Sequence, residues 1–224
     1  MKIYLATFYS SDLKRSANRF KHQAEEMQVY DKIFLYNQND LNKDFRDYIH
    51  MLLKKGKERG YGHWVWQTYI HQLVLSQIDY GDIYHWCDVG CHFNPRGIWR
   101  LKEYVDLVNN DEKGFLFFSY KKPIINNINK DYDFPSNYEY QYTKSDLLKY
   151  FNLKPSDEIV QTPQVWGGSF FLKKTKSSEK LMKNHYDITR NRYDLIDDEE
   201  IKFIERSHQG FIAHRHSQSV LSIL

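Results

Sequence analysis

Short apolar runs alternate with longer amphipathic stretches along the first half of the chain. Residues 2–8, 32–36, 83–87 and 115–119 are short, apolar and rich in β-branched or aromatic side chains, which predicts strands. Between them, apolar residues recur at helical spacing over 12–27, 45–57, 63–77 and 103–108. This alternation predicts an α/β domain whose parallel strands are joined by helical crossovers.

The second half of the chain has a less regular pattern. Residues 121–142 are rich in Asn, Asp, Tyr and Pro without periodicity, which predicts a long loop. Helices are predicted over 143–151, 177–192 and 197–204, and the last residues, HSQSVLSIL, resemble the beginning of another. We interpret the acidic group that opens 197–204 as a complement to the helix dipole rather than as a metal site.

A further strand is predicted over 165–172 in the sequence TPQVWGGSFF, where Gly167 and Gly168 interrupt the apolar run. Two glycines let the backbone turn sharply or approach another group closely, such as a sugar or a phosphate. A β-bulge is the alternative interpretation.

Length and composition restrict the class of protein. A chain of 224 residues suits one domain, residues 1–224, although it would also suit the leading domain of a longer protein. With 41% hydrophobic and 27% charged residues and a mean hydropathy of −0.72, a soluble globular protein is expected. The net charge is only +3 and the basic residues are scattered, so no nucleic-acid footprint is indicated.

The chain shows no sign of secretion or membrane insertion. The first residues, MKIYLATFYSS, lack the long apolar core of a signal peptide, and no run approaches the roughly 18 apolar residues of a membrane span. Cys87 and Cys91 are expected to face different directions, on a strand and at its exit, without a disulfide. We therefore expect a cytoplasmic protein, with peripheral association at the inner face of the membrane left open.

The first candidate for chemistry is Asp88, in IYHWCDVGCHFNP. A carboxylate at the carboxyl end of a strand in an open α/β sheet lies where such sheets bind ligands. An aspartate at that position is also a common turn former, so the pattern alone leaves both interpretations open.

Two further stretches, one rich in histidine and one in aromatic residues, supply candidates. His214 and His216 flank Arg215 in FIAHRHSQSVLSIL, and on an extended segment the two imidazoles would face the same side and bind Mn²⁺ or Zn²⁺. Arg215 suits phosphate, and surface histidines are the alternative. In GYGHWVWQTY, Trp64 and Trp66 form either a stacking platform beside a flexible turn or part of a helix-packing core.

Five motifs in order resemble a family: RGYGHWVWQTY, GDIYHWCDVGCHFN, EYQYTKSDLLKYF, QVWGGSFFLKKT and HRHSQSVLSIL. They look like bacterial glycosyltransferases of the nucleotide-sugar-binding GT-A type, associated with surface-polysaccharide synthesis such as capsule or lipooligosaccharide. The resemblance implies a Rossmann-type central sheet flanked by helices and a hexosyltransferase-like enzyme. It also implies a nucleoside diphosphate sugar donor, a glycan or lipid-linked glycan acceptor, and Mn²⁺ or Mg²⁺.

The resemblance assigns roles to individual residues. Asp88 with His214 or His216 would hold the cation. Gln218 would lie on the face of the anomeric carbon opposite the leaving group in a retaining reaction, and Asp146 is the candidate general base for an inverting one. The donor would be bound by Thr7, Tyr9, Arg15, Arg59, Asp88, Gly90, Gly167, Gly168 and Arg215.

Four residues, in three motifs, depart from the family pattern. Gly90 occupies the second acidic place of the usual DXD motif, Ser217 stands where Asp is usual, and Gln67 and Thr68 replace a Lys-Pro pair. Gly90 and Ser217 favour a second hypothesis, a non-catalytic nucleotide- or sugar-binding domain of the same fold. A metal-dependent hydrolase using Asp88, His214 and His216 is a third.

Overall fold

The computed structural model describes residues 1–119, 137–199 and 207–224. Within these residues the chain divides into two compact units. Met1–Phe117 and Gly168–Tyr186 form the first unit, and Phe118–Gly167 and Asp187–Leu224 form the second. The expectation of a single domain stays a prediction, and each unit is described by itself.

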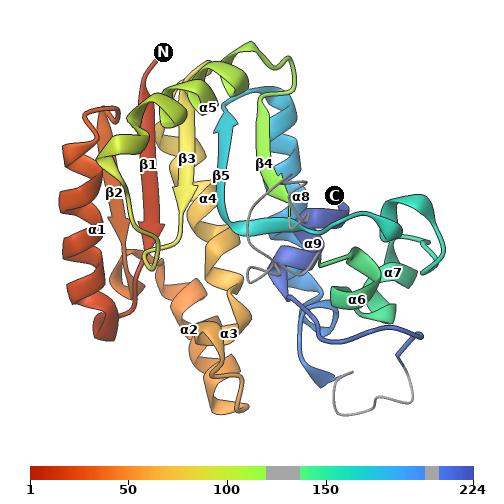
Figure 1. The fold of residues 1–224 in the computed structure, drawn as a ribbon. Helices are drawn as coiled ribbons and strands as arrows, with labels where there is room; N and C mark the ends of the chain where they lie inside the picture. The colour runs from red at the N-terminus through yellow and green to blue at the C-terminus, as the bar shows by residue number, and fades with distance from the viewer. Residues whose placement is uncertain (120–136, 200–206) are drawn as a thin grey trace, which may run out of the picture. The chain divides into compact units, whose positions relative to one another are not determined.

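The described strands form one mixed sheet, in the order β2-β1-β3-β5-β4 (Figure 1). Its strands are β1 (Ile3–Phe8), β2 (Lys32–Tyr36), β3 (Ile83–Cys87), β4 (Phe115–Ser119) and β5 (Val165–Lys173). β1 pairs in parallel with β2 and with β3, and β5 pairs antiparallel to β3. The predicted α/β class, a central sheet flanked by helices, is therefore confirmed.

Helices cover both faces of the sheet because alternate strand residues point to opposite faces. Leu5 and Cys87 pack with Ala17, Phe20 and Ala24 of α1 (Lys14–Glu26) on one face. On the other face, Trp86 contacts the rings of Trp66 and His71 in α4 (Val65–Gln77). All five residues of β3 are buried, as expected for a strand covered on both sides.

Further helices complete the first unit. α2 (Lys43–Lys54) and α3 (Gly60–His63) precede α4, and α5 (Ile98–Asn110) places Tyr104 5.8 Å from the ring of Phe171. The helix α8 (Lys176–Asn191) begins in the first unit and ends in the second. Within the described residues, no helix combines the length and apolar character that spanning a bilayer requires.

The second unit contains α6 (Glu139–Tyr142), α7 (Ser145–Tyr150) and α9 (Ser217–Ile223). The side chain of Glu139 is buried there and accepts hydrogen bonds from Thr143 Oγ1 at 2.8 Å and Gln164 Nε2 at 3.0 Å. Burial raises the pKa of this carboxyl. A buried polar group needs such partners, so Glu139 and its donors tie α6 to the segment that leads into β5.

The predicted elements and the observed ones agree closely in the first half of the chain. The strands at 32–36, 83–87 and 115–119 have the predicted bounds. The helix predicted over 63–77 instead begins at Val65, because the residues before it have left-handed backbone angles. The expectation that Cys87 and Cys91 face apart is wrong, since the two side chains hydrogen-bond each other within one core cluster.

The second half differs more. The predicted interruption of the strand at Gly167 and Gly168 is wrong, because β5 runs through both residues. Of the loop predicted over 121–142, residues up to 136 lie outside the described part, and Glu139–Tyr142 form α6. Of the helix predicted over 197–204, residues 197–199 are not α-helical and the remainder lies outside the described part. The C-terminal helix is confirmed as α9.

Candidate functional site

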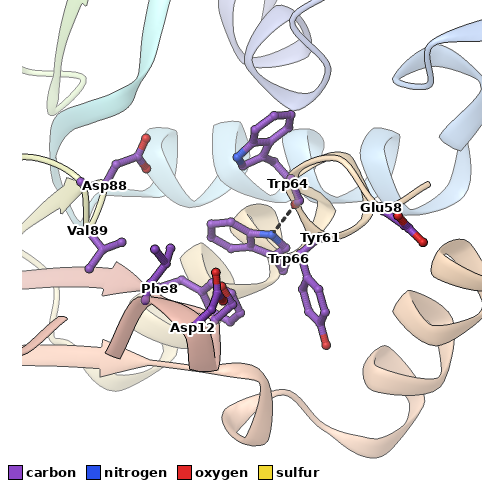
Figure 2. A pocket seen from close by; sticks show the side chains of 12 residues that line it. Phe8, Asp12, Glu58, Tyr61, Trp64, Trp66, Asp88 and Val89 are labelled. Carbon is purple, nitrogen blue, oxygen red and sulfur yellow. Dashed lines mark hydrogen bonds between the residues drawn. The ribbon is translucent and has the colours of Figure 1, made fainter. Parts of the chain in front are cut away.

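A cavity of about 530 Å³ lies within the first unit, at the carboxyl ends of β1 and β3. Three segments line it: the end of β1 and the residues after it, the segment from α2 to α4, and the turn after β3. The lining residues are Phe8, Ser10, Asp12, Leu13, Glu58, Gly60, Tyr61, Trp64, Trp66, Asp88, Val89 and Gly90 (Figure 2).

The topology of the sheet explains why a cavity forms there. From β1 the chain crosses through α1 to β2 on one side, and from β2 it returns through α2, α3 and α4 to β3 on the other side. Because α1 and α4 cover opposite faces, the loops that leave β1 and β3 separate and leave a crevice between them. Open α/β sheets bind ligands at such switch points.

Asp88 is the most perturbed acid of this cavity. Its backbone N–H donates to the Gly168 carbonyl at 2.8 Å, and its own carbonyl accepts from the Cys91 N–H at 2.9 Å. Burial raises the pKa of its carboxyl to about 7. Asp12 and Glu58 also line the cavity, whereas none of its described lining residues is Lys or Arg. Carboxylate oxygens are ligands of hard divalent cations, but among the described residues no group of three metal-ligating side chains comes together within this cavity, and the predicted Mn²⁺ or Mg²⁺ stays a prediction.

A left-handed turn forms the second wall of the cavity. Five successive residues have positive φ: Gly60 (57°), Tyr61 (53°), Gly62 (86°), His63 (56°) and Trp64 (61°). Left-handed helical backbone costs about 1 to 2 kcal/mol for each non-glycine residue, because Cβ approaches the following carbonyl oxygen. Tyr61, His63 and Trp64 are not glycine, so each adds this unfavourable free energy, and surrounding contacts must hold the turn in place.

Hydrogen bonds and ring contacts hold this turn. The His63 N–H donates to the Arg59 carbonyl at 2.8 Å, and the Trp64 N–H donates to the Gly60 carbonyl at 3.1 Å. The Gly60 carbonyl also accepts from Trp66 Nε1 at 2.9 Å, as the dashed line in Figure 2 marks. The ring of Trp66 stacks on that of Phe8 with centroids 4.1 Å apart, which connects the turn to the end of β1.

The two tryptophans of GYGHWVWQTY therefore differ in their surroundings. Trp66 is buried, belongs to α4 and has its indole nitrogen paired, so it packs in the core as well as lining the cavity. Trp64 is half-buried, precedes α4 and forms part of the cavity wall. The core-packing interpretation describes Trp66, whereas a stacking platform at Trp64 stays a prediction.

Thr7 and Tyr9, the two residues near the end of β1 that are predicted to contact the nucleotide, lie outside the cavity lining. Thr7 is fully buried within the sheet, and Tyr9 packs against the apolar cluster under α1. Neither lines the cavity, whereas Phe8 and Ser10 do. Because side chains alternate along a strand, the cavity takes the opposite set of residues from the one predicted.

The two arginines proposed for phosphate binding are both exposed. Arg15 lies in the first turn of α1 and is not among the residues that line the cavity. Arg59 directly precedes the left-handed turn, and its guanidinium carbon lies 5.8 Å from the centre of the Trp64 ring. The structure thus brings Arg59, and not Arg15, next to a residue of the cavity wall.

In the second unit, His214 is held by two hydrogen bonds. Its Nε2 lies 3.0 Å from the Leu195 carbonyl oxygen and donates to it, so Nδ1 accepts from the Lys144 N–H at 3.3 Å. Burial lowers the pKa of His214 well below its ordinary value, which keeps the ring neutral. With both nitrogens engaged, His214 offers no ligand atom in this arrangement, which argues against its predicted role in metal binding.

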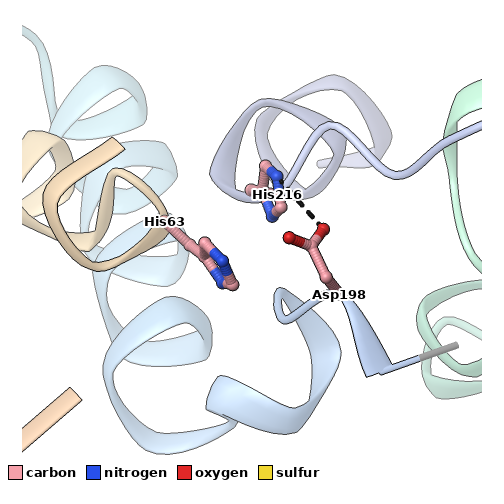
Figure 3. A group of neighbouring side chains, drawn as sticks. All are labelled: His63, Asp198 and His216. Atoms are coloured by element: carbon pink, nitrogen blue, oxygen red, sulfur yellow. Dashed lines mark ion pairs between the residues drawn. The ribbon is translucent and has the colours of Figure 1, made fainter. Parts of the chain in front are cut away.

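His216 has a different environment. Its Nδ1 lies 2.7 Å from the Ile196 carbonyl oxygen and carries the proton, while its Nε2 faces Asp198 Oδ1 at 3.5 Å (Figure 3). The guanidinium of the neighbouring Arg215 lies over the ring of Tyr142, with 4.6 Å to the ring centre. The metal-binding role of His216 and the phosphate-binding role of Arg215 stay predictions.

Gln218 and Asp146, the two predicted catalytic residues, also lie in the second unit. Gln218 Oε1 accepts from the Gly167 N–H at 3.0 Å, and its Nε2 donates to Gln164 Oε1 at 2.9 Å, so both ends of the amide bind protein groups. Asp146 is exposed on α7, 3.7 Å from Lys149 Nζ. The two hydrogen bonds give Gln218 a structural role, and the catalytic roles of Gln218 and Asp146 stay predictions.

Some residues of the cavity escape sequence reasoning. Asp12 and Glu58 look like ordinary surface acids in the sequence. Side chains alternate between two faces along the strand predicted over 2–8, and this alternation places Phe8 and Ser10 on the same side. No comparable sequence pattern indicates Asp12 or Glu58.

Comparisons with known proteins give similarity to solved structures alone. No family model matches the chain, and no curated protein matches it either. Among solved structures, the chain is similar to one described as a glycosyltransferase involved in the glycosylation of the major capsid of PBCV-1, with 12% identity and a TM-score of 0.46. The match covers 96% of this chain and 81% of that one. A match at this level does not establish an activity, so the functional case rests on the residues of the site.

Proposed function

We propose that the protein is a glycosyltransferase that binds a nucleoside diphosphate sugar in the cavity of the first unit and transfers the sugar to a glycan acceptor. The observation that carries this proposal is the position of Asp88, whose desolvated carboxyl lines a cavity at the topological switch point of an α/β sheet. The ordered motifs that resemble GT-A enzymes support it.

The charged residues that line the cavity limit which ligands it can bind. Its described lining contains three acids and no Lys or Arg, so a bare diphosphate would be repelled. Asp88 would hold a divalent cation, and that cation would neutralise charge on the departing diphosphate. The backbone hydrogen bonds on both sides of Asp88 fix where its carboxyl lies.

The finer assignments are extensions of this proposal. The resemblance favours a hexosyl donor, Mn²⁺, a lipid-linked or other glycan acceptor, and a role in bacterial surface-polysaccharide synthesis at the inner face of the membrane. Because the amide of Gln218 binds Gly167 and Gln164, a retaining reaction is better served by a front-face route in which the diphosphate assists the acceptor. Asp146 remains the candidate base for an inverting reaction.

The alternative is a non-catalytic nucleotide-binding domain. Gly90 favours it, because this exposed residue lines the cavity and offers no carboxylate where a second acid would strengthen cation binding.

Incubation with a panel of nucleotide sugars and Mn²⁺, with and without glycan acceptors, separates the two functions. Release of nucleoside diphosphate from one donor above the no-enzyme rate, abolished by EDTA, supports the transferase. Nucleotide binding without turnover of any donor would support the binding domain instead.

A further inference from the structure

We propose that the left-handed turn Gly60–Trp64 is a preorganised base-binding wall, in which Gly60 positions the indole of Trp64 to stack on the nucleobase of the donor. This inference rests on the proposed function and assigns a part of the donor to one wall of the cavity. It gives Trp64 a role in specificity and Gly60 a role in positioning.

The first support is the contact between Gly60 and Trp64. A Cβ added at Gly60 would lie 2.4 Å from Cδ2 and 2.5 Å from Cε2 and Cε3 of the Trp64 indole. The indole therefore lies directly against the bare Cα of Gly60, where no other residue type leaves room for it. Trp64 is half-buried and lines the cavity, so its position shapes the space that a ligand occupies.

The second support is backbone strain at the cavity wall. Tyr61, His63 and Trp64 are non-glycine residues with left-handed angles, and such strain persists only where surrounding contacts enforce it. Here the contacts are the hydrogen bond from Trp66 Nε1 to the Gly60 carbonyl and the stacking of Trp66 on Phe8. An ordinary helix start at this position would place the Trp64 side chain differently relative to Gly60.

The third support is the distribution of charge. Glu58 and Asp12 line the cavity with the turn, whereas Arg59, whose guanidinium carbon lies 5.8 Å from the centre of the Trp64 ring, is not among the described lining residues, so the lining itself presents no cation to a phosphate. A neutral part of the donor is therefore expected against this wall. Of the neutral parts, only the base presents a π face, and an aromatic side chain stacked on a base contributes about 1–3 kcal/mol.

The test is calorimetric binding of UDP and GDP to the full chain in the presence of Mn²⁺. Trp64→Ala is expected to weaken binding by about 5- to 150-fold, in line with the loss of one stacked base. Trp64→Phe, which keeps an aromatic face, should remain close to the wild type. Gly60→Ala should resemble Trp64→Ala, because its Cβ displaces the indole.

Two control variants separate the effect of losing the Trp64 ring from a general loss of structure. Gly56 has φ 75° and nothing within 4 Å of an added Cβ, so Gly56→Ala has the same kind of backbone strain without touching Trp64. Trp99 is exposed on α5 and outside the cavity lining, so Trp99→Ala removes an indole elsewhere. Both should bind UDP and GDP like the wild type. If circular dichroism shows that Trp64→Ala is unfolded, Trp64→Leu is measured in its place, because leucine is apolar and has no π face.

The outcomes separate this inference from the proposed function. Equal weakening of UDP and of a UDP-sugar by Trp64→Ala excludes the sugar as the group in contact with the indole and, with Trp64→Phe retaining affinity, supports stacking on the base. Weakening confined to the UDP-sugar would overturn the assignment to the base, and unchanged affinity in a variant that still turns over donor would overturn the inference alone. A wild type that binds no nucleotide with Mn²⁺ would overturn both proposals.

Discussion

The backbone N–H of Asp88 donates a hydrogen bond of 2.8 Å to the carbonyl oxygen of Gly168. This bond extends the pairing of β3 with β5 one residue past the last residue of β3. The Asp88 carbonyl then accepts from the Cys91 N–H at 2.9 Å, which closes a tight turn. The carboxyl that the proposed cation needs is thus positioned by main-chain bonds on both sides.

Gly90 in this turn offers a direct way to strengthen the proposed cation site. An added Cβ at Gly90 meets nothing within 4 Å, and its φ lies outside the left-handed region, so Gly90→Asp fits without strain. A second carboxylate in the same cavity should increase Mn²⁺ affinity about tenfold, which corresponds to about 1.4 kcal/mol. Calorimetric titration with Mn²⁺ measures this change.

Gly97 supplies the matched control for that variant. It also has open space around an added Cβ and an ordinary φ, but it lies outside the cavity lining. Gly97→Asp adds the same charge and should leave Mn²⁺ affinity unchanged. Equal Mn²⁺ affinities for Gly90→Asp and Gly97→Asp would argue against a cation at this turn.

Acid should destabilise the first unit through its buried histidines. Burial lowers the pKa of His85 to about 3 and that of His71 well below its ordinary value. Between the unfolded pKa near 6.5 and these folded values, the unfolded chain binds protons that the folded one does not. Through these histidines, the free energy of unfolding is constant above about pH 6.5 and falls below it, by up to about 1.4 kcal/mol per pH unit for each histidine. The raised pKa of Asp88 acts in the opposite direction between about pH 4 and 7 with the slope of one group, so the two histidines together outweigh it.

Urea denaturation at pH 7.5, 6.0 and 5.0 measures this dependence. His85 Nδ1 lies 2.7 Å from the Tyr30 hydroxyl and its Nε2 3.0 Å from Ser169 Oγ, so His85→Gln keeps polar groups while removing the titration. The acid-induced loss should become smaller in this variant. His22 is exposed beside Glu26, and His22→Gln should leave the pH dependence as it is. An identical pH profile for His85→Gln and wild type would rule out the buried-histidine explanation.

The contact between Gly167 and Gln218 should be sensitive to one added carbon. A Cβ at Gly167 would lie 3.3 Å from Cβ and Cγ of Gln218, whose Oε1 accepts the Gly167 N–H. Gly167→Ala should therefore destabilise the protein by about 1–3 kcal/mol, as crowding or a lost buried hydrogen bond does. Thermal and urea unfolding give the value.

A double-mutant cycle tests whether the crowding is local. Gln218→Ala removes the crowding side chain, so Gly167→Ala should cost less in that background than in the wild type. Additive effects of Gly167→Ala and Gln218→Ala would contradict crowding between these two residues as the cause. Gln218→Ala also tests the structural role, since a loss of stability with donor turnover retained per folded molecule removes Gln218 from the chemistry.

The sequence predicts the sheet well because each strand of the first unit is a short apolar run next to a helix of clear periodicity. The run ending at Cys87 and the break at Asp88 identify the strand end, and parallel pairing with β1 then brings Asp88 into the cavity. Such features depend on local patterns, which a sequence displays. Thr7 and Tyr9 lie outside the cavity lining, because side chains alternate along the strand and Phe8 and Ser10 face the cavity.

The rest of the site depends on tertiary contacts that a sequence does not display. The left-handed angles of Tyr61 and His63 are enforced by bonds such as that from Trp66 to Gly60, and ordinary propensity favours a helix there. His214 resembles a metal ligand until Leu195 and Lys144 are seen to bind both of its nitrogens. Strain and hydrogen-bond partners of this kind become visible only in three dimensions.

The central claim, that Asp88 holds a cation that binds the donor diphosphate, is tested most directly by calorimetric titration of UDP and GDP with and without Mn²⁺. Wild type should bind at least one of the two, and removal of Mn²⁺ should weaken that binding at least tenfold. Asp88→Asn, which keeps the shape and the backbone bonds, should bind as weakly with Mn²⁺ as the wild type does without it. Mn²⁺-dependent binding that is the same in Asp88→Asn and wild type would contradict the claim.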